Sequence, residues 1–440
     1  MGLKYLEQVK SAILLLLIVM SLTLTFSIWT YSPSYETIDA PIVNIAIAEK
    51  RKMEDVVKPY RVIISQGDNL RGSNSSSIID REMNSMKSWE VQTVELLNNQ
   101  ATASQINEYI NGSNKMTFFY QAEVPIRTFA SILMFGDTIY PDTSFNRLVV
   151  DWSKEAREGI SLFFINTNTQ KVYRAGVEKE DRNAFVERIN SQVRTLPIYN
   201  EVENKGKLSL YVSASPEKLT RSTYYMEDIA TERFKNALFS NPSLVRTNPL
   251  GTSGLEYTDD SALMKVDFQN RNLSYFHPAS ESSYSISPAE LIQNSLGFVN
   301  EHDGWTNDYR YTRMNPTNQQ VIYQLHYAGL PVFSYDTATE IVQYWGANRV
   351  YRYNRPYYTL NSLPINKEVV LPSGQEIYNL LSVLPDVRIS SINDIMPGYQ
   401  LSRNTNQPLV TLEPTWYYSL NGTWIRISDE ILGGGKSGLE

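Results

Sequence analysis

The first hydrophobic run, Ala12–Tyr31, constrains this 440-residue chain more than any other stretch. Its sequence, AILLLLIVMSLTLTFSIWTY, contains no charged residue, no proline and no glycine. At about 1.5 Å per helical residue, the run spans roughly 30 Å, which matches the hydrocarbon core of a bilayer. The sequence therefore predicts a transmembrane anchor over residues 12–31.

Charges on either side of the run predict its orientation. Lys4 and Lys10 precede it, whereas Glu36 and Asp39 follow it and no lysine or arginine appears after it until Lys50. Positive charge is retained on the cytoplasmic side of a membrane. We therefore expect a single-pass protein of the cell membrane, with residues 1–11 cytoplasmic and the rest of the chain extracytoplasmic.

A cleaved signal peptide is the alternative interpretation of the same run. Signal peptides have a shorter apolar region, of about 7–15 residues, followed by small residues at the cleavage site. Here the run ends in Ile28-Trp29-Thr30-Tyr31-Ser32-Pro33, which lacks that pattern. An uncleaved anchor is the better interpretation.

Four hydroxyl residues give the anchor a candidate interaction face. Ser21 and Thr25 are four residues apart, as are Thr23 and Ser27. Small or hydroxyl residues at that spacing allow a second transmembrane helix to approach closely. The alternative is that these hydroxyls bond their own helix backbone, which is the commoner situation. The sequence leaves both interpretations open.

Composition limits the possible functions. The chain is 42% hydrophobic and 20% charged with a net charge of −7, which is typical of a globular protein of two or three domains. The mild acidity argues against a nucleic-acid partner. The absence of cysteine excludes disulfides, thiolate metal sites and cysteine nucleophiles.

Helical segments and alternating apolar strands predict an α+β fold, in which three extracytoplasmic domains consist of antiparallel sheets packed with helices. Among the expected elements are helices over about 126–135 and 228–239, the latter with Asp228 as N-cap, and a strand over 91–97. The predicted ranges are a stalk at 32–58 with a helix near 49–58, an N-terminal α/β domain at 59–196, a central α+β domain at 197–285, a C-terminal α+β domain at 286–432 and a flexible tail at 433–440.

Three local signals are sharper than the rest. Ser287-Pro288-Ala289-Glu290 combines a capping box with proline at the first helical position, so a helix should begin there. Ser373 should cap a second helix that runs to about residue 382. Asn421-Gly422 predicts a tight hairpin turn between the last two strands.

The search for catalytic motifs finds none that is complete. Gly433–Ser437 lacks the earlier glycine of a phosphate-binding loop, and Gly251–Gly254 is one residue short of a nucleophile elbow. His277, His302 and His326 are isolated from one another and from other ligand types. We therefore predict no catalytic, cofactor-binding or metal-binding residues, and a protein that is not an enzyme.

Aromatic strands around Tyr344, Trp345, Tyr351 and Tyr353 give a second functional hypothesis. Such residues can line a concave site, so an exported module that binds a cell-wall ligand is the alternative function. Ordinary packing of these rings within a sheet is the commoner explanation.

Several stretches of the chain match a known family: Lys10–Leu14 with Ile28–Tyr31, Gly329–Phe333, Tyr351–Pro356 and Leu409–Tyr418. In these stretches the chain resembles the YycH family. The resemblance covers nearly the whole chain and contains no catalytic motif.

The resemblance implies a regulator of the essential WalK (YycG) sensor histidine kinase of low-GC Gram-positive bacteria. Family members act with a sister protein, YycI, and hold the kinase in check through contacts that include the transmembrane helices; in some species they activate it. A helix that packs on the kinase helices shifts their equilibrium only if it contacts the two states differently. The sequence gives neither the sign of regulation nor the partner surface on the exported part.

Overall fold

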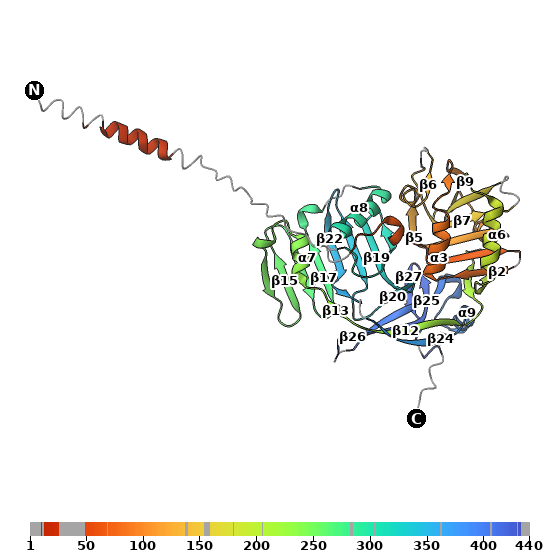
Figure 1. The fold of residues 1–440 in the computed structure, drawn as a ribbon. Coiled ribbons are helices and arrows are strands. Elements are labelled where there is room, and N and C mark those ends of the chain that lie inside the picture. Colours follow the sequence, from red (N-terminus) through yellow and green to blue (C-terminus); the bar gives the residue numbers. More distant parts are fainter. Residues whose placement is uncertain are drawn as a thin grey trace, which may run out of the picture. The chain divides into compact units, whose positions relative to one another are not determined.

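The computed structural model describes residues 10, 13–25, 49–67, 69–136, 140–153, 159–178, 180–204, 206–281, 285–302, 304–360, 363–404, 407–428 and 430–432. The chain divides into two compact units, Met1–Ile45 and Ala46–Glu440, which are described separately (Figure 1).

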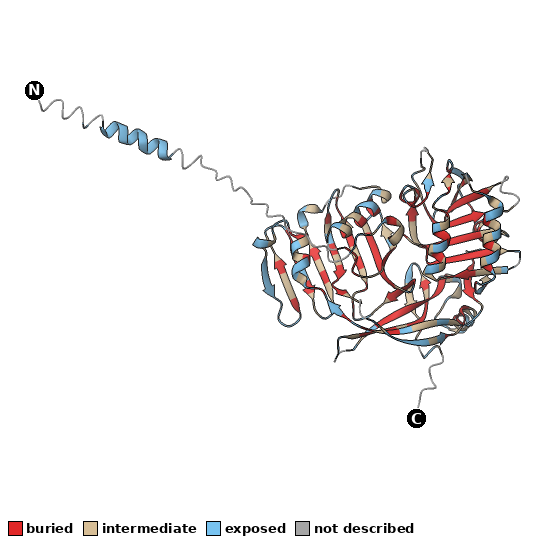
Figure 2. Ribbon diagram, in the orientation of Figure 1, coloured by how far each residue is buried: buried red, intermediate tan, exposed pale blue. Residues whose placement is uncertain are grey.

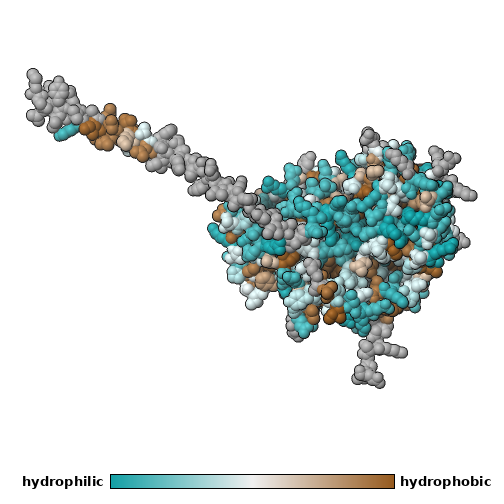
Figure 3. Space-filling view, in the orientation of Figure 1, coloured by the Kyte–Doolittle hydropathy of each residue, from teal (hydrophilic) through white to brown (hydrophobic). Residues whose placement is uncertain are grey.

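In the first unit, residues 13–25 are α-helical and exposed. Their apolar side chains are brown in Figure 3. No helix within the described residues is long and apolar enough to cross a membrane. Residue 12 and residues 26–31 of the expected anchor lie outside the described residues, as do stalk residues 32–48 and the tail 433–440. The anchor and the flexible tail therefore stay predictions.

The second unit begins with an 11-stranded sheet, counted over the described residues, in the order β11-β10-β2-β1-β5-β7-β8-β9-β3-β6, with β4 beside β9. Neighbouring strands are antiparallel except for the parallel pair β3 and β6. The strands of this first sheet are β1 (Arg61–Gln66), β2 (Asn69–Ser73), β3 (Glu90–Val91), β4 (Glu95–Asn98), β5 (Lys115–Pro125), β6 (Met134–Phe135), β7 (Ser144–Asp151), β8 (Ile160–Asn166), β9 (Lys171–Glu178), β10 (Ile198–Val202) and β11 (Leu210–Ser213).

Helices cover both faces of the first sheet, and the alternation of side chains along β1 shows why. Val62 and Ile64 pack in the same core as α3 (Ser76–Ser85) and α6 (Arg182–Val193), whereas Ile63 packs in the core that contains α4 (Ala103–Asn111). Both faces of the central strands are therefore buried, as their red colour in Figure 2 shows. The short helices α2 (Met53–Val56) and α5 (Ile126–Phe129) complete this part.

A second sheet, 14-stranded over the described residues, follows the order β14-β15-β16-β17-β22-β21-β19-β20-β25-β26-β12-β24, with β18 beside β19 and β27 beside β26. Its strands are β12 (Glu217–Tyr225), β14 (Arg246–Pro249), β15 (Gly254–Thr258), β16 (Leu263–Asp267), β17 (Asn272–Phe276), β18 (Tyr309–Asn315), β19 (Gln320–Tyr327), β20 (Leu330–Phe333), β21 (Glu340–Trp345), β22 (Val350–Pro356), β24 (Ile365–Leu371), β25 (Ile392–Arg403), β26 (Leu409–Leu420) and β27 (Thr423–Arg426).

Three further helices pack on these strands. Buried residues of α7 (Thr231–Leu238) and α8 (Pro288–Glu301) belong to the same core as the central strands, and α9 (Gly374–Val383) packs with β11, β25 and β26. Also present are the strand pair β13 (Glu227–Asp228) with β23 (Tyr358–Thr359) and the 3-10 turns η1 (Pro242–Leu244), η2 (Pro278–Ser280) and η3 (Ile389–Ser391). Sheets packed against helices confirm the predicted α+β class.

The three sharp local signals are confirmed. Ser287 and Ser373 each form a capping box, with Glu290 and Glu376 respectively, and the helices begin at the next residue. Asn421 and Gly422 both have positive φ angles, of 50° and 80°, and connect β26 to β27. Two successive positive φ angles are what a two-residue hairpin turn of this kind requires.

Other predicted elements differ where long-range pairing overrides local preference. Asp228 is not an N-cap: it pairs with Tyr358 in β13–β23, and α7 begins at Thr231. The helix expected over 126–135 ends at Phe129, because Met134–Phe135 pairs with β3. The strand expected over 91–97 is divided between β3 and β4, and within 49–58 only Met53–Val56 is α-helical.

The sheets also cross the residue ranges predicted as separate domains. Strands β10 and β11 join the first sheet, β12 lies between β26 and β24, and β17 pairs with β22. Strands of the range 197–285 are therefore shared between the two sheets. The domain boundaries themselves stay a prediction.

Candidate functional site

Two of the predicted interaction residues of the anchor, Thr23 and Thr25, use their hydroxyls within their own helix. Thr23 Oγ1 donates to the carbonyl oxygen of Val19 at 3.0 Å, and Thr25 Oγ1 donates to that of Ser21 at 2.8 Å. Ser27 lies outside the described residues. These bonds favour the own-backbone interpretation of the hydroxyls, but they leave small side chains on the helix surface. The helix–helix contact stays a prediction.

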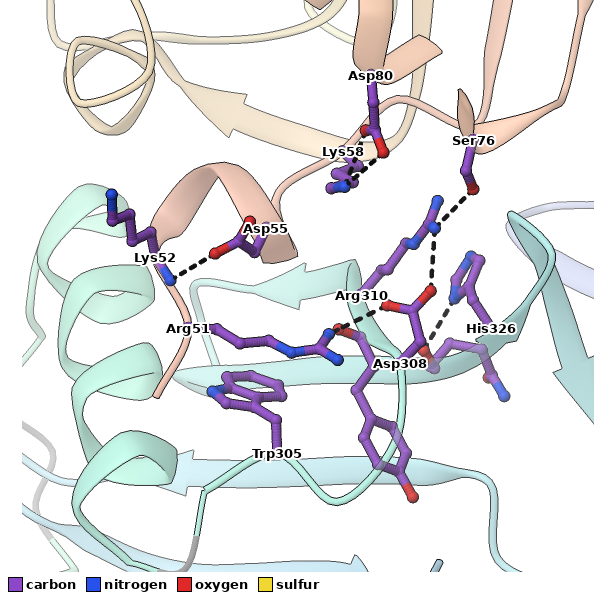
Figure 4. A network of polar contacts seen from close by, with 12 residues as sticks. Arg51, Lys52, Asp55, Lys58, Ser76, Asp80, Trp305, Asp308, Arg310 and His326 are labelled. Carbon is purple, nitrogen blue, oxygen red and sulfur yellow. Dashed lines mark hydrogen bonds and ion pairs between the residues drawn. The ribbon is translucent and has the colours of Figure 1, made fainter. Parts of the chain in front are cut away.

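A polar network surrounds residues 51–58, which form the last part of the predicted stalk (Figure 4). The backbone of Arg51 makes two bonds with one side chain: its N–H donates to Asn300 Oδ1, and its carbonyl accepts from Asn300 Nδ2, both at 2.9 Å. The Arg51 guanidinium lies 5.9 Å from the ring centre of Trp305. Residues near the start of the second unit are thereby attached to the end of α8 and the loop that follows it.

Asp308 connects this entry segment to β18 of the second sheet and, through Arg310, to α3. Its two carboxylate oxygens accept from Arg51 Nη1 at 3.1 Å and from Arg310 Nη2 at 3.0 Å. Arg310 Nη2 also donates to Ser76 Oγ at 2.8 Å, at the first residue of α3. Burial alone would raise the pKa of Asp308, but the charge of Arg310 with its hydrogen bond, and the charge of Arg51, lower that pKa below its ordinary value.

His326 lies beside the same cluster (Figure 4), and its backbone N–H donates to the Asp308 carbonyl oxygen at 2.7 Å. Its side chain is buried, with Nδ1 2.9 Å from the carbonyl oxygen of Gln324. Burial and the positive charge of Arg310 lower its pKa to about 3. The imidazole is therefore neutral at physiological pH, and its Nδ1 carries the proton that the carbonyl accepts.

Two more ion pairs attach the entry segment to α3 and the turn after it. Lys58 Nζ lies 2.8 Å from Asp80 Oδ1, and Lys87 Nζ lies 2.7 Å from Glu54 Oε2. Residues 51–58 thus contact helix α8, strand β18 of the second sheet, and helix α3, which covers the first sheet. No local sequence signal could have identified this cluster, because Arg51 and Asp308 are 257 residues apart.

A buried ion pair joins the two sheets directly. Arg61, next to Tyr60 at the start of β1, bonds to Asp394 Oδ1 and to the Ile395 carbonyl, both at 2.8 Å, and Asp394 also accepts a hydrogen bond from the Tyr60 hydroxyl. The exposed fractions of the Arg61 and Asp394 side chains are only 2% and 11%. Burial, followed by the charge of Asp394, raises the pKa of Tyr60, which therefore stays protonated and donates.

The two sheets also enclose a polar cleft of about 840 Å³. Side chains from both line it, among them Gln121, Arg147, Arg313, Glu340 and Trp424. Burial raises the pKa of the Glu340 carboxyl, which Arg313 partly offsets. The volume of the cleft lies in the range of small-ligand sites, but its lining is more polar than is usual for them.

The aromatic strands proposed as a ligand site are mostly part of the core. Tyr353 is fully buried and Trp345 is 5% exposed. Trp345 borders a hollow of about 650 Å³ that is also lined by Tyr275 and His302, but Tyr344 and Tyr351 do not line it. Sheet packing accounts for most of these rings.

The histidines have structural partners, and the described residues contain no group of three or more His, Cys, Asp or Glu side chains placed to hold a metal ion. His277 Nδ1 lies 2.8 Å from Ser280 Oγ. His302 ends α8, and its Nδ1 lies 2.9 Å from the carbonyl of Phe298, as its place at a helix C-terminus predicts.

Together these observations define an α+β protein in which two large, mostly antiparallel sheets are joined by a buried ion pair and by the segment through which the chain enters. The sequence matches the family descriptions "YycH protein, N-terminal domain" over residues 7–193 and "YycH protein, C-terminal domain" over residues 207–431. The chain belongs to the YycH family.

Two relatives agree with this assignment. The chain is 24% identical over 454 residues to the "Two-component system WalR/WalK regulatory protein YycH" of Bacillus subtilis (strain 168), and the match covers 99% of each chain. The crystal structure of YycH from Bacillus subtilis superposes with a TM-score of 0.73 at 22% identity, covering 87% of this chain and 99% of that one. The fold of the two proteins is therefore the same.

Proposed function

We propose that this protein is a membrane-anchored regulator that restrains a sensor histidine kinase similar to WalK and acts together with a sister protein similar to YycI. Membership of the YycH family and the name of the Bacillus relative support a role in two-component signalling. In this proposal the protein is a single-pass membrane protein with its N-terminus in the cytoplasm, and it works by binding rather than by catalysis.

The observation that carries the proposal is the attachment of the entry segment to helices that pack on both sheets, α3 and α8, and to the loop before β18. Arg51 is bound to Asn300, Trp305 and Asp308, while Lys58 is bound to Asp80 on α3. A folded body that is tied at several points to its own N-terminal segment can pass a displacement along the chain, whereas a loosely tethered body cannot. A coupling of about 1–3 kcal/mol between two kinase states would change activity roughly 5–150-fold.

The experiment is co-purification of the full-length protein with the membrane histidine kinase. It is compared with a variant in which residues 12–31 are replaced by an unrelated poly-leucine span of equal length. We expect the kinase to accompany the native chain and not the variant, because specific helix contacts depend on the small residues of the native span.

A narrower substitution tests the predicted face. Ser21→Leu together with Thr25→Leu should weaken both co-purification and kinase restraint at unchanged protein level, while Leu22→Ile with Leu24→Ile is the matched control. Recovery of the kinase with both anchors would show that the exported part carries recognition. Recovery of the kinase with neither anchor would contradict direct contact between the kinase and this protein.

A ligand-binding module for the cell wall is the second candidate. The polar cleft of about 840 Å³ between the two sheets favours it, because groups from both sheets line one hollow. Failure of both forms to recover the kinase would make this the leading function.

A further inference from the structure

The outermost strands of the two sheets differ in how well their free backbone edges are protected from pairing with another chain. β6 has two residues, β4, β14 and β27 have four each, and β14 ends in Pro249, which has no N–H to donate. β11 is fully buried and packs with α9, whose Gly374 N–H donates to Ser213 Oγ. The side branch β18 lies against β5, where Tyr311 Oη donates to the Glu123 carbonyl at 2.7 Å. Each of these edges is short or covered.

β24 is different, because it is a long strand at the end of the second sheet. Its seven residues, Ile365–Leu371, pair with β12 over their whole length. Within the described part of the chain, nothing pairs with its opposite edge. Pro364 and Pro372 lie immediately outside the strand, so the edge that can donate hydrogen bonds is limited to these seven residues.

Exposed apolar side chains accompany this free edge. Ile365 is 75% exposed and Val370 is 57% exposed, and they lie on opposite faces of the strand because their numbers differ in parity. Between them, Lys367 and Glu368 are also exposed. Figure 1 places β24 at the lower margin of the body, and Figure 2 shows it largely pale blue. A long, exposed edge strand is a template for pairing with another chain.

We propose that the free edge of β24 is a docking site at which an extended segment of a different polypeptide adds a strand to the second sheet. Backbone hydrogen bonds would supply the affinity, and side chains opposite β24 would supply the specificity. The fitting segment has apolar residues opposite Ile365 and Val370, a basic residue opposite Glu368 and an acidic residue opposite Lys367.

Charge disfavours a second copy of this chain as the occupant of this edge. Two copies that extend one antiparallel sheet are related by a twofold axis perpendicular to it, so residues opposite each other must have the same parity. Three symmetric registers pair at least five residues of β24. The register that pairs all seven places Glu368 opposite Glu368, and one of the five-residue registers places Lys367 opposite Lys367. The third, centred on Val369, pairs only residues 367–371, leaves Ile365 unpaired and gives neither Lys367 nor Glu368 an opposite charge. Like charges directly opposite each other destabilise a strand pair.

This inference goes beyond the proposed function, since it concerns a surface of the exported body and does not depend on the anchor or the kinase. It is tested with the full-length protein in detergent and a fluorescently labelled peptide, acetyl-TVTKETV-amide. In antiparallel register this peptide places lysine opposite Glu368, glutamate opposite Lys367 and valine opposite both Ile365 and Val370. The matched control, acetyl-TVTEKTV-amide, has the same composition with the two charges exchanged.

Fluorescence anisotropy should show saturable binding of the first peptide and about tenfold weaker binding of the second, because two attractive cross-strand pairs become repulsive. The double variant Lys367→Glu with Glu368→Lys should reverse this preference. Both side chains are exposed, so the variant is expected to fold, which circular dichroism verifies.

Three outcomes would overturn the inference. The first is no binding of either peptide, or equal binding that the charge exchange does not alter. The second is a dimer in light scattering that the double variant abolishes, which would make a second copy the occupant. The third is binding that appears only after residues 433–440 are deleted, which would identify the chain's own tail as the occupant.

Discussion

At the scale of single residues, His326 should make stability depend on pH. Its pKa is about 3 in the folded protein and about 6.5 in the unfolded chain, because burial and then Arg310 oppose its charged form while Asp308 only partly offsets them. Between these values the unfolded chain binds more protons, so stability is full above pH 6.5 and is lost as the pH falls toward 3. The expected slope is up to about 1.4 kcal/mol per pH unit.

Urea unfolding at a series of pH values measures this slope, and His326→Asn isolates it. Asparagine keeps a donor for the Gln324 carbonyl but does not titrate. The difference in unfolding free energy between native and variant chains should therefore shrink steadily from pH 6.5 to pH 4. A constant difference would show that His326 does not control this part of the pH profile.

At the scale of elements, the turn between β19 and β20 must lie very close to α3. Gly329 has a φ angle of +90°, and a Cβ atom there would be 2.5 Å from Ser76 Oγ and 3.0 Å from the Asn74 carbonyl oxygen. Gly329→Ala therefore strains the backbone, which has a positive φ angle there, and the new methyl group clashes with Asn74 and Ser76. We expect a loss of about 1–3 kcal/mol of unfolding free energy, measured by denaturant titration.

Gly297→Ala is the matched control for this substitution. Gly297 lies inside α8, and a Cβ atom added there would meet nothing within 4 Å. Alanine in a helix interior is favoured over glycine, so the control should gain about 0.5–1 kcal/mol. Equal effects at the two glycines would contradict the close approach of the turn to α3.

At the scale of the whole molecule, the Arg61–Asp394 pair should hold the two sheets in one cooperative unit. Asp394→Asn leaves the Arg61 charge buried and without its partner, which typically costs about 3–5 kcal/mol. We expect a much lower urea midpoint and the appearance of two separate transitions. Tryptophan fluorescence and circular dichroism would detect these as non-coincident curves.

Glu413→Gln tests whether any broken ion pair has this effect. Glu413 pairs with Arg221 at 2.8 Å, but the two side chains are 36% and 46% exposed. Exposed pairs contribute at most about 1 kcal/mol. For Glu413→Gln we expect a single unfolding transition with an only slightly lower urea midpoint. A loss of unfolding free energy as large as that of Asp394→Asn would show that the buried pair has no special role.

Features that depend on neighbouring residues could be predicted from the sequence. The capping boxes at Ser287 and Ser373 and the turn at Asn421-Gly422 are confirmed, because each satisfies its backbone groups within a few residues. The α+β class followed from the periodicity of apolar residues. The anchor over 12–31 and its hydroxyl face stay predictions that follow from the run alone.

Only the tertiary structure decided how distant segments pair. Strands β10 and β11 pair into the first sheet, and Asp228 pairs with Tyr358 rather than capping a helix. The network around Asp308 and the Arg61–Asp394 pair join residues separated by more than 230 positions. A strand edge or a buried charge is satisfied by whichever partner the whole fold brings near, and one sequence carries no local signal of that choice.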